Sequence, residues 1–377
     1  MDSAHGIIIN GNSLSFTPGE TILDVAKKNS IDIPTLCYLK GASPTGTCSI
    51  CVVEVEGESE LVTACSTLCA ENMVVHTESP SVVESRKKTL EVLLATGNHN
   101  CAISDSTGSD WTEFQLKVQK DDGDAELCPV WGDCRLQDLA YRYQVTGDRS
   151  KATDCPYPME SVNPFIVRDF SRCILCGRCV QACNDIQVNN AITVGRKEPV
   201  NKIVAGEDVA LKDSDCVFCG ECVQACPVGA LVEKDVKYKV RHWETQQVQT
   251  TCSYCGVGCQ IHLHVKDDKV VKVTGVEGAV PNYGSLCVKG RFGFDFISSD
   301  ERLTAPLIKE NGKFREASWE EATTLVADKL GAIKDEFGSD AIGVLTSARV
   351  SNEENYIAHK FTRAVLKTNN IDHCARL

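Results

Sequence analysis

The sequence predicts a multidomain α+β protein. Three observations predict this class: the length, the grouping of the cysteines, and the alternation of short strand and helix signals. The chain has 377 residues, which corresponds to two or three domains of average size. Its 22 cysteines fall mostly into short runs. Between the runs lie short β-branched segments and capped amphipathic helices, so small units of mixed strand and helix are expected.

Charge and composition exclude several classes of partner. The net charge of −13 argues against binding to nucleic acid or to anionic membrane surfaces. No run of about 18 apolar residues occurs, so no membrane span is predicted. The N-terminal residues lack a basic and apolar signal sequence, and we therefore expect a cytoplasmic protein. In that reducing compartment, cysteines in a chain too long for a small disulfide scaffold are expected to be metal ligands.

Two near-identical runs occupy the middle of the chain. Both read C-x2-C-x2-C-x3-C, the pattern with which bacterial ferredoxins bind two [4Fe–4S] clusters. Three closely spaced thiolates surround one cluster, and the fourth points away and ligates the other. Zinc sites, which use paired C-x2-C rather than a duplicated four-cysteine run, and disulfides are the rival interpretations. The expected ligands are Cys173, Cys176, Cys179 and Cys226 for one cluster, and Cys216, Cys219, Cys222 and Cys183 for its neighbour.

Residues 1–79 predict a small α+β domain. Apolar residues 7–9 and 14–16 flank a turn signal, and Thr21-x-x-Asp24 resembles a capping box at the start of a helix. Four cysteines follow that could bind a [2Fe–2S] rhombus, with two thiolates on each iron, and the alternative is a β-sandwich with buried cysteines. Cys69 fits no spacing and is interpreted as a core residue. The four expected ligands are Cys37, Cys48, Cys51 and Cys65.

This spacing resembles the N-terminal domain of three families: the large iron–sulfur subunit of respiratory complex I, iron-only hydrogenases, and NAD-linked formate dehydrogenases. The resemblance implies a β-grasp fold. In those families a His/Cys3 [4Fe–4S] block follows, which implies a second domain at 80–158 with ligands His99, Cys101, Cys128 and Cys134. Here the block departs from the family pattern, because residues 102–127 are inserted within it. A solvated helix cap is the alternative for His99.

The segment before His99 predicts a helix. Its apolar face includes Val82, Leu90 and Leu94, and Arg86-Lys87-Lys88 is interpreted as its solvated face. Further along, residues 159–240 are expected to form the two-cluster ferredoxin domain, with strands near 163–168, 191–194 and 230–232. Cys155 fits no motif and is interpreted as structural.

Residues 241–300 contain a separate site with the spacing C-x2-C-x3-C-x27-C. The four cysteines are Cys252, Cys255, Cys259 and Cys287. An alternating pattern at 262–265 and 270–273 predicts a hairpin that returns Cys287 to the other three. The arrangement resembles the N-terminal [4Fe–4S] domain of molybdopterin-dependent oxidoreductases. That resemblance implies that Lys289 lies between the cluster and the pterin as an electron relay, whereas outside this context a surface charge would be expected.

Residues 301–377 predict the start of an α/β domain. Ser318-x-x-Glu321 and Ser351-x-x-Glu354 are capping signals for two helices, and residues 341–345 read as a strand buried in a parallel sheet. The segments 352–356 and 369–377 resemble the catalytic subunit of molybdenum- or tungsten-dependent formate dehydrogenases. In that family the next residue is the metal ligand, selenocysteine or cysteine. We therefore expect no catalytic residue within the chain, and we expect that a UGA codon follows Leu377; a natural split subunit and a cloned fragment are the alternatives.

The resemblance implies a complete electron path. Formate would be oxidised at a bis-molybdopterin guanine dinucleotide with Mo or W, and electrons would pass through four [4Fe–4S] clusters to one [2Fe–2S] cluster. The implied partners are flavin and iron–sulfur subunits that oxidise NAD(P)H, or a hydrogenase, in a hetero-oligomer. The alternatives are the complex I large iron–sulfur subunit, an iron-only hydrogenase, and a stand-alone multi-cluster electron carrier. The C-x2-C-x3-C-x27-C block argues against the hydrogenase.

Overall fold

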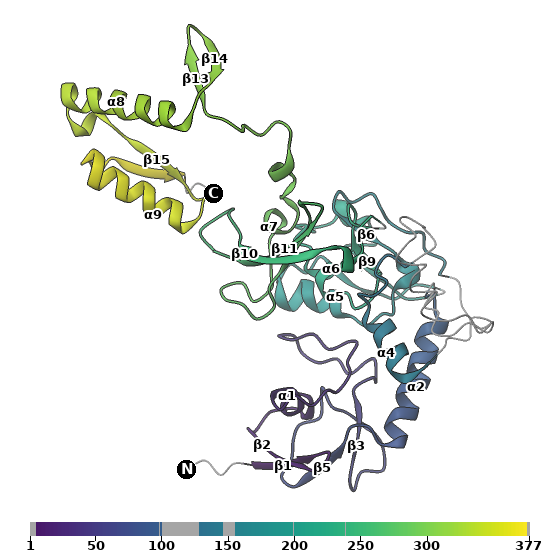
Figure 1. Ribbon diagram of the computed structural model, residues 1–377. Helices are drawn as coiled ribbons and strands as arrows, with labels where there is room; N and C mark the ends of the chain where they lie inside the picture. The colour runs from purple at the N-terminus through teal and green to yellow at the C-terminus, as the bar shows by residue number, and fades with distance from the viewer. Residues whose placement is uncertain are drawn as a thin grey trace. The chain divides into compact units, whose positions relative to one another are not determined.

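The computed structural model describes residues 5–97, 99, 128–145, 155–198, 200–237 and 239–374 (Figure 1). The chain divides into two compact units, Met1–Thr245 and Gln246–Leu377. Within the described residues, no helix is both long enough and apolar enough to cross a membrane.

A five-stranded sheet with the order β2-β1-β5-β3-β4 opens the first unit. The hairpin predicted at its start is confirmed, with a turn at Asn10-Gly11 in which both residues have positive φ. β1 also pairs with β5 in parallel, and helix α1 lies in the segment of chain that connects these two strands. The strands are β1 (His5–Ile9), β2 (Asn12–Phe16), β3 (Val52–Val55), β4 (Val62–Thr63) and β5 (Met73–His76).

Helix α1 (Ile22–Lys28) closes the core of this sheet. The predicted capping box is confirmed: the Asp24 amide donates to the Thr21 hydroxyl at 3.2 Å, and the Thr21 amide donates to the Asp24 carboxylate at 3.0 Å. The buried face of α1 packs with β1, β3 and β5, and the same core includes Cys51 and Cys65. The cysteine loops are therefore anchored in the core of the domain.

A second core joins the N-terminal domain to the segments that follow it. Helices α2 (Pro80–Ala95) and α4 (Arg135–Tyr143) contribute Leu90, Leu94, Leu136 and Leu139. The core also takes side chains from the loop before β3 and from the second ferredoxin run. It was not predicted, because its members come from segments that are far apart in the sequence.

The ferredoxin segment consists of two strand pairs and two short helices. Strand β6 (Ile166–Arg168) pairs with β9 (Leu231–Glu233), and β7 (Ile192–Gly195) pairs with β8 (Lys202–Ala205), in each case antiparallel. The helices are α5 (Arg178–Gln181), which continues as a π-helical turn at Ala182–Ile186, and α6 (Glu221–Ala225). Single 3-10 turns lie at Phe170–Arg172, Leu211–Asp213 and His242–Glu244.

The second unit begins with an antiparallel sheet of β10 (Gln246–Thr251), β11 (Gln260–Lys266) and β12 (Lys269–Gly275). The predicted hairpin is β11–β12, and β10 was not predicted. Helix α7 (Val288–Phe292), a 3-10 turn at Asp295–Ser298 and the hairpin of β13 (Leu307–Glu310) with β14 (Lys313–Glu316) follow.

The last segment contains two helices and a pair of parallel strands. Ser318 and Ser351 cap helices α8 (Trp319–Phe337) and α9 (Asn352–Phe361), as predicted, and α9 continues as a π-helical turn at Thr362–Leu366. The strand expected at 341–345 is β15 (Val344–Ser347), which pairs in parallel with β16 (Ile371–Cys374). The expected burial is absent at Leu345, which is 86% exposed.

Candidate metal centres

The four N-terminal cysteines meet as two thiol pairs. Cys37 and Cys48 share one hydrogen bond, and Cys51 and Cys65 share another. The hydrogen bond with Cys48 lowers the pKa of Cys37 to about 5. The bond with Cys65, together with burial, raises the pKa of Cys51. Two adjacent pairs of sulfur atoms are the donor set that a two-iron rhombus requires, with two thiolates on each iron.

A buried arginine positions the loop that carries Cys48 and Cys51. The guanidinium of Arg86 donates to the carbonyl of Ile50 at 2.9 Å and to the carbonyl of Val52 at 2.8 Å. These carbonyls lie on either side of Cys51 in the sequence. Arg86 is completely buried, so its assignment to the solvated face of the helix was wrong. Charged side chains are rarely buried without partners, and its partners could not be identified from the helix periodicity.

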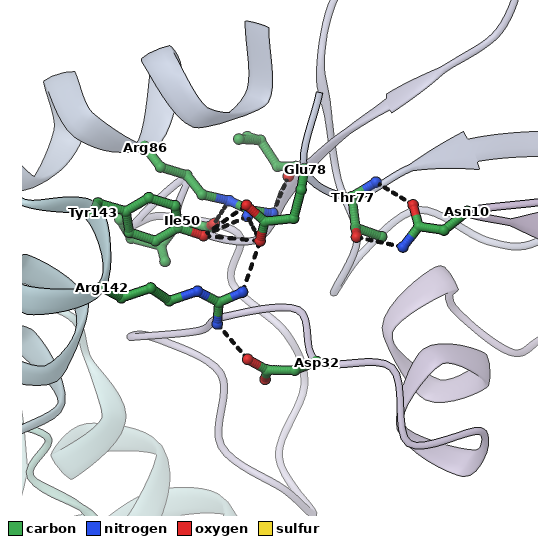
Figure 2. Close-up of polar contacts among 9 residues, drawn as sticks. Asn10, Asp32, Ile50, Thr77, Glu78, Arg86, Arg142 and Tyr143 are labelled. Carbon is green, nitrogen blue, oxygen red and sulfur yellow. Dashed lines mark hydrogen bonds and ion pairs between the residues drawn. The ribbon is translucent and has the colours of Figure 1, made fainter. Parts of the chain in front are cut away.

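Figure 2 shows the polar network around this arginine. Arg86 also donates to Tyr143 at 2.7 Å and to Glu78 at 2.8 Å. Arg142 on α4 pairs with the same Glu78 and with Asp32. The network therefore ties α2 and α4 to the loops of the N-terminal domain.

A second contact in Figure 2 fixes the entry to α2. The Asn10 amide donates to the Thr77 hydroxyl at 2.8 Å, and the Thr77 backbone N–H donates to the Asn10 side-chain oxygen at 2.9 Å. Asn10 follows β1, and Thr77 follows β5. The paired bonds hold the end of the sheet next to the start of the helix.

The predicted His/Cys3 set is described in part. His99, Cys128 and Cys134 are all buried, whereas Cys101 and the whole of the 102–127 insert lie outside the described residues. Burial of His99 does not agree with a solvated helix cap. Arg241 donates to the carbonyl of Cys128 at 2.6 Å, and Cys134 belongs to the core shared by α2 and α4.

Five cysteines from both ferredoxin runs line one apolar cavity, and one of them, Cys222, is assigned to the reciprocal set. The cavity contains Cys173, Cys176 and Cys179 from the first run and Cys226 from the second. Burial raises the pKa of Cys173 to about 11 and that of Cys176 to about 12, and the nearby Cys226 thiol adds to both shifts. The chain therefore brings the fourth cysteine of one run to the first three of the other, as the spacing predicts.

Three cysteines of the reciprocal set, Cys183, Cys216 and Cys219, also lie near one another. Burial raises the pKa of Cys216, and electrostatic repulsion from Cys219 and Cys183 adds to the rise. Backbone amides donate to these sulfur atoms: Phe218 to Cys216 and Ala191 to Cys183, each at 3.4 Å. Such bonds stabilise the thiolate form, which is the form that binds iron.

The second unit assembles the remaining predicted cysteines. Burial raises the pKa of Cys259, and the neighbouring thiols of Cys252, Cys255 and Cys287 add to the rise. The hairpin β11–β12 thus returns the last cysteine to the first three. Lys289 lies in α7, two residues after Cys287, and its side chain is exposed.

Among the described residues, no three His, Cys, Asp or Glu side chains converge tightly enough to hold a single metal ion. A four-iron cluster spreads its thiolate ligands around a larger body than one ion. The donor sets are therefore suited to clusters by their sulfur chemistry, and the set at Cys173, Cys176, Cys179 and Cys226 also by its cavity.

An open pocket of about 590 Å³, lined mainly by residues with polar side chains, lies at the carboxyl ends of β15 and β16, and sequence reasoning missed it. Asn352 at the start of α9 belongs to its lining, and its side-chain amide donates at 2.8 Å to the carbonyl of Gly256. Gly256 lies between Cys255 and Cys259. The carboxyl ends of parallel strands are the usual ligand-binding edge of an α/β sheet, which is the signal that could have located it.

Four domain families match successive parts of the chain. Residues 6–80 match the 2Fe-2S iron-sulfur cluster binding domain, and residues 172–230 match the 4Fe-4S dicluster domain. Residues 245–299 match the molybdopterin oxidoreductase Fe4S4 domain, and residues 302–377 match the molybdopterin oxidoreductase domain. The chain is thus a multidomain α+β iron–sulfur protein with the start of a molybdopterin domain, as the sequence predicted.

Curated relatives match almost the whole chain. "Putative formate dehydrogenase YrhE" of Bacillus subtilis (strain 168) is 32% identical over 406 residues, and "Probable oxidoreductase YjgC" of the same strain is 31% identical over 408 residues. Each match covers 98% of this chain and 39% of the relative, so the chain spans about two-fifths of their length. A crystal structure of an NAD+-reducing [NiFe]-hydrogenase matches with a TM-score of 0.52 and 27% identity, covering 63% of this chain and 91% of that chain.

Proposed function

We propose that this chain, which carries iron–sulfur domains and the start of a molybdopterin domain, conducts electrons for a formate dehydrogenase. The observation that carries the proposal is the continuity between cysteine sets. One hydrophobic core contacts Cys48 of the N-terminal domain, Cys134, and both Cys173 and Cys226 of the ferredoxin cavity. Cysteine sets that pack against the same core would hold successive clusters near each other. The choice of formate is supported by the names of relatives that match over 98% of the chain.

The proposed ligands follow the thiol groupings. The N-terminal pairs would hold a [2Fe–2S] cluster, and each cysteine set of the ferredoxin segment and of the second unit would hold a [4Fe–4S] cluster. His99 with Cys101, Cys128 and Cys134 would hold another. When bound, these clusters supply one-electron transfer, and a pterin-bound Mo or W supplies the two-electron chemistry.

The protein's own contribution to electron transfer is to fix and tune these sites. Buried thiols keep the sites apolar, and backbone amides such as that of Leu175, which donates to Cys173 at 3.4 Å, stabilise the negative sulfur. In the second unit, we place Lys289 as a cation between the last cluster and the pterin. The cavity at the ends of β15 and β16 would form part of the pterin site, with Asn352 joining it to the cluster loop.

The partner we propose is an NAD(P)H-oxidising flavin and iron–sulfur unit or a hydrogenase, in a hetero-oligomer. Structural similarity to a chain of an NAD+-reducing hydrogenase supports this class of partner. Electrons would leave through the N-terminal domain, because it lies at the opposite end of the chain from the molybdopterin segment.

Metal analysis of the protein from its own host tests the proposal. A tag on the N-terminus would be used to purify the protein together with any bound partner subunits and any polypeptide that follows residue 377. We expect about 18 iron atoms per chain, with Mo or W and formate-dependent reduction of a viologen dye. Iron without Mo or W, and without any response to formate, would instead identify a stand-alone electron carrier. NADH-dependent reduction without a response to formate would favour a complex I-like subunit.

A further inference from the structure

The first two cysteines of the predicted His/Cys3 set are far apart in the sequence. The 102–127 insert separates Cys101 from Cys128. A connection of that length places little constraint on the distance between its ends. The position of Cys128 therefore has to be set by contacts with other parts of the chain.

Arg241, the residue before the 3-10 turn His242–Glu244, makes such a contact. Its Nη1 donates to the carbonyl of Cys128 at 2.6 Å, and the residue is 7% exposed. The same carbonyl accepts the backbone N–H of Trp131 at 3.2 Å. The backbone N–H of Arg241 itself donates to the carboxylate of Glu244 at 2.7 Å. The arginine is thus anchored at its own main chain and holds the main chain of Cys128.

The turn after Arg241 packs closely on the loop that follows Cys128. A Cβ on Gly132, whose φ is 81°, would lie 2.7 Å from Cε1 of His242 and 2.9 Å from Cζ3 of Trp243. Carbon atoms in contact are normally about 3.5–4.0 Å apart, so only glycine fits here. Trp243 also packs against the apolar cluster that contains Cys128. The turn therefore fits the loop in shape as well as in hydrogen bonding.

One donor of this buried guanidinium has no acceptor within the described part of the chain. Nη2 of Arg241 is shielded from solvent and makes no hydrogen bond to a described residue. The two Nη atoms of a guanidinium are bonded to one carbon, so an acceptor for Nη2 has to lie close to Cys128 as well. A buried charged donor without an acceptor is costly. The group proposed to bind at Cys128, a [4Fe–4S] cluster, would present sulfur acceptors there.

We propose that Arg241 is a positioning residue for the cluster at His99, Cys101, Cys128 and Cys134: Nη1 fixes the main chain of Cys128, and Nη2 donates to a sulfur atom of the bound cluster. The inference rests on the cluster assignment of the proposed function. A hydrogen bond from a cation stabilises the negative charge that the cluster gains with an electron, so it raises the reduction potential. The planar fork of arginine serves two acceptors at once, which the ammonium of lysine does not match.

Redox titration of the full chain, monitored by electron paramagnetic resonance, tests this. The hyperfine coupling to the imidazole nitrogen of His99 identifies the cluster concerned in pulsed spectra. Arg241→Met should lower the ratio of reduced to oxidised form of that cluster about tenfold, which is about 59 mV for a one-electron couple, and leave the other midpoints unchanged. Arg241→Lys should retain the cluster and lower its midpoint by a smaller amount.

Arg135→Met is the matched control. Arg135 follows Cys134 directly, but it is exposed, so solvent and salt screen its charge. This variant removes the same group beside another ligand of the same set and retains the backbone N–H of residue 135. We expect it to change the ratio of reduced to oxidised cluster by less than about twofold. A shift as large as that of Arg241→Met would contradict a specific role for Arg241.

Iron and sulfide assays separate the possible outcomes. Selective loss of the nitrogen-coupled signal and of about four iron atoms in Arg241→Met would also support the positioning role. A wild-type midpoint in Arg241→Met at full iron content would overturn the inference, and a wild-type midpoint in Arg241→Lys would overturn the hydrogen bond from Nη2. If Arg241→Met loses every cluster, Arg241→Lys decides the question.

The wild-type protein separates this inference from the proposed function. Complete absence of [4Fe–4S] signals would contradict the proposed function, and this inference with it. Signals from the other clusters without a nitrogen-coupled one would contradict the His/Cys3 assignment and the role of Arg241, and they would leave electron transfer by the remaining sets intact.

Discussion

Replacing Arg86 by methionine should loosen the loop that carries Cys51. Methionine retains most of the apolar stem and removes the guanidinium, so the change isolates the polar contacts. Arg86 donates to two backbone carbonyls, to Tyr143 and to Glu78. The carbonyls belong to Ile50 and Val52, which are both buried, so water cannot easily replace the lost donors.

The expected cost is large. A buried acceptor that loses its donor costs about 1–3 kcal/mol, and removal of one partner from a buried ionic network costs about 3–5 kcal/mol. Glu78 is half-exposed and can be solvated by water, which limits the total. We therefore expect Arg86→Met to lower the free energy of opening of this loop by about 3–5 kcal/mol.

Hydrogen–deuterium exchange of the segment 48–55 measures that opening directly. Protection in Arg86→Met should fall by roughly a hundredfold or more, since each 1.4 kcal/mol is a factor of ten. Arg142→Met is the matched control, because Arg142 belongs to the same network but is more exposed, and its pairs are worth less than about 1 kcal/mol. Equal exchange in the two variants, or protection within tenfold of wild type for Arg86→Met, would refute the reasoning.

Three further predictions concern other parts of the chain. Asn163→Ala should lower the free energy of unfolding, measured in urea, by about 1–3 kcal/mol. The buried Asn163 side chain accepts two backbone N–H bonds at the start of β6, each of 2.9 Å. A change below about 0.5 kcal/mol would contradict this. Cys51→Ser should remove the [2Fe–2S] signal and about two iron atoms, whereas Cys69→Ser should retain both, and loss of the signal in both variants would argue against the assignment. Burial lowers the pKa of His264 to about 4, so the unfolded state, with an ordinary value near 6.5, binds a proton that the folded state does not. Protection of β11 from exchange should therefore fall as the pH is lowered from 6.5 toward 4, and it should fall less in His264→Gln.

Local signals in the sequence predicted the elements whose causes are local. The Thr21/Asp24 capping box, the Asn10-Gly11 turn and the capping residues Ser318 and Ser351 each act within four residues, and all are found where expected. The cysteine spacing also grouped thiols that the structure brings near one another, such as Cys173, Cys176, Cys179 and Cys226 at one cavity, and their assignment to clusters stays a prediction.

The features that sequence reasoning missed depend on contacts between distant segments. Arg86 lies in a helix whose periodicity gives no reason to bury it, and three of its four partners are 34, 36 and 57 residues away. Strand β10 is polar and exposed along its length, so no hydrophobic alternation identifies it. The cavity at β15 and β16 cannot be predicted without knowing which strands pair. In each case the missing information is a long-range contact.

The exchange of cysteines between the two ferredoxin runs has a consequence for biosynthesis. The cavity that contains Cys173, Cys176 and Cys179 is completed by Cys226, and Cys183 lies beside Cys216. Neither set is therefore complete while only the first run has left the ribosome. At roughly 5–20 residues per second, the interval between Cys183 and Cys226 is about two to nine seconds. If these sets hold clusters as proposed, the first run would remain reduced and unligated during that time, and it would be open to reaction with oxygen or to capture of a wrong metal.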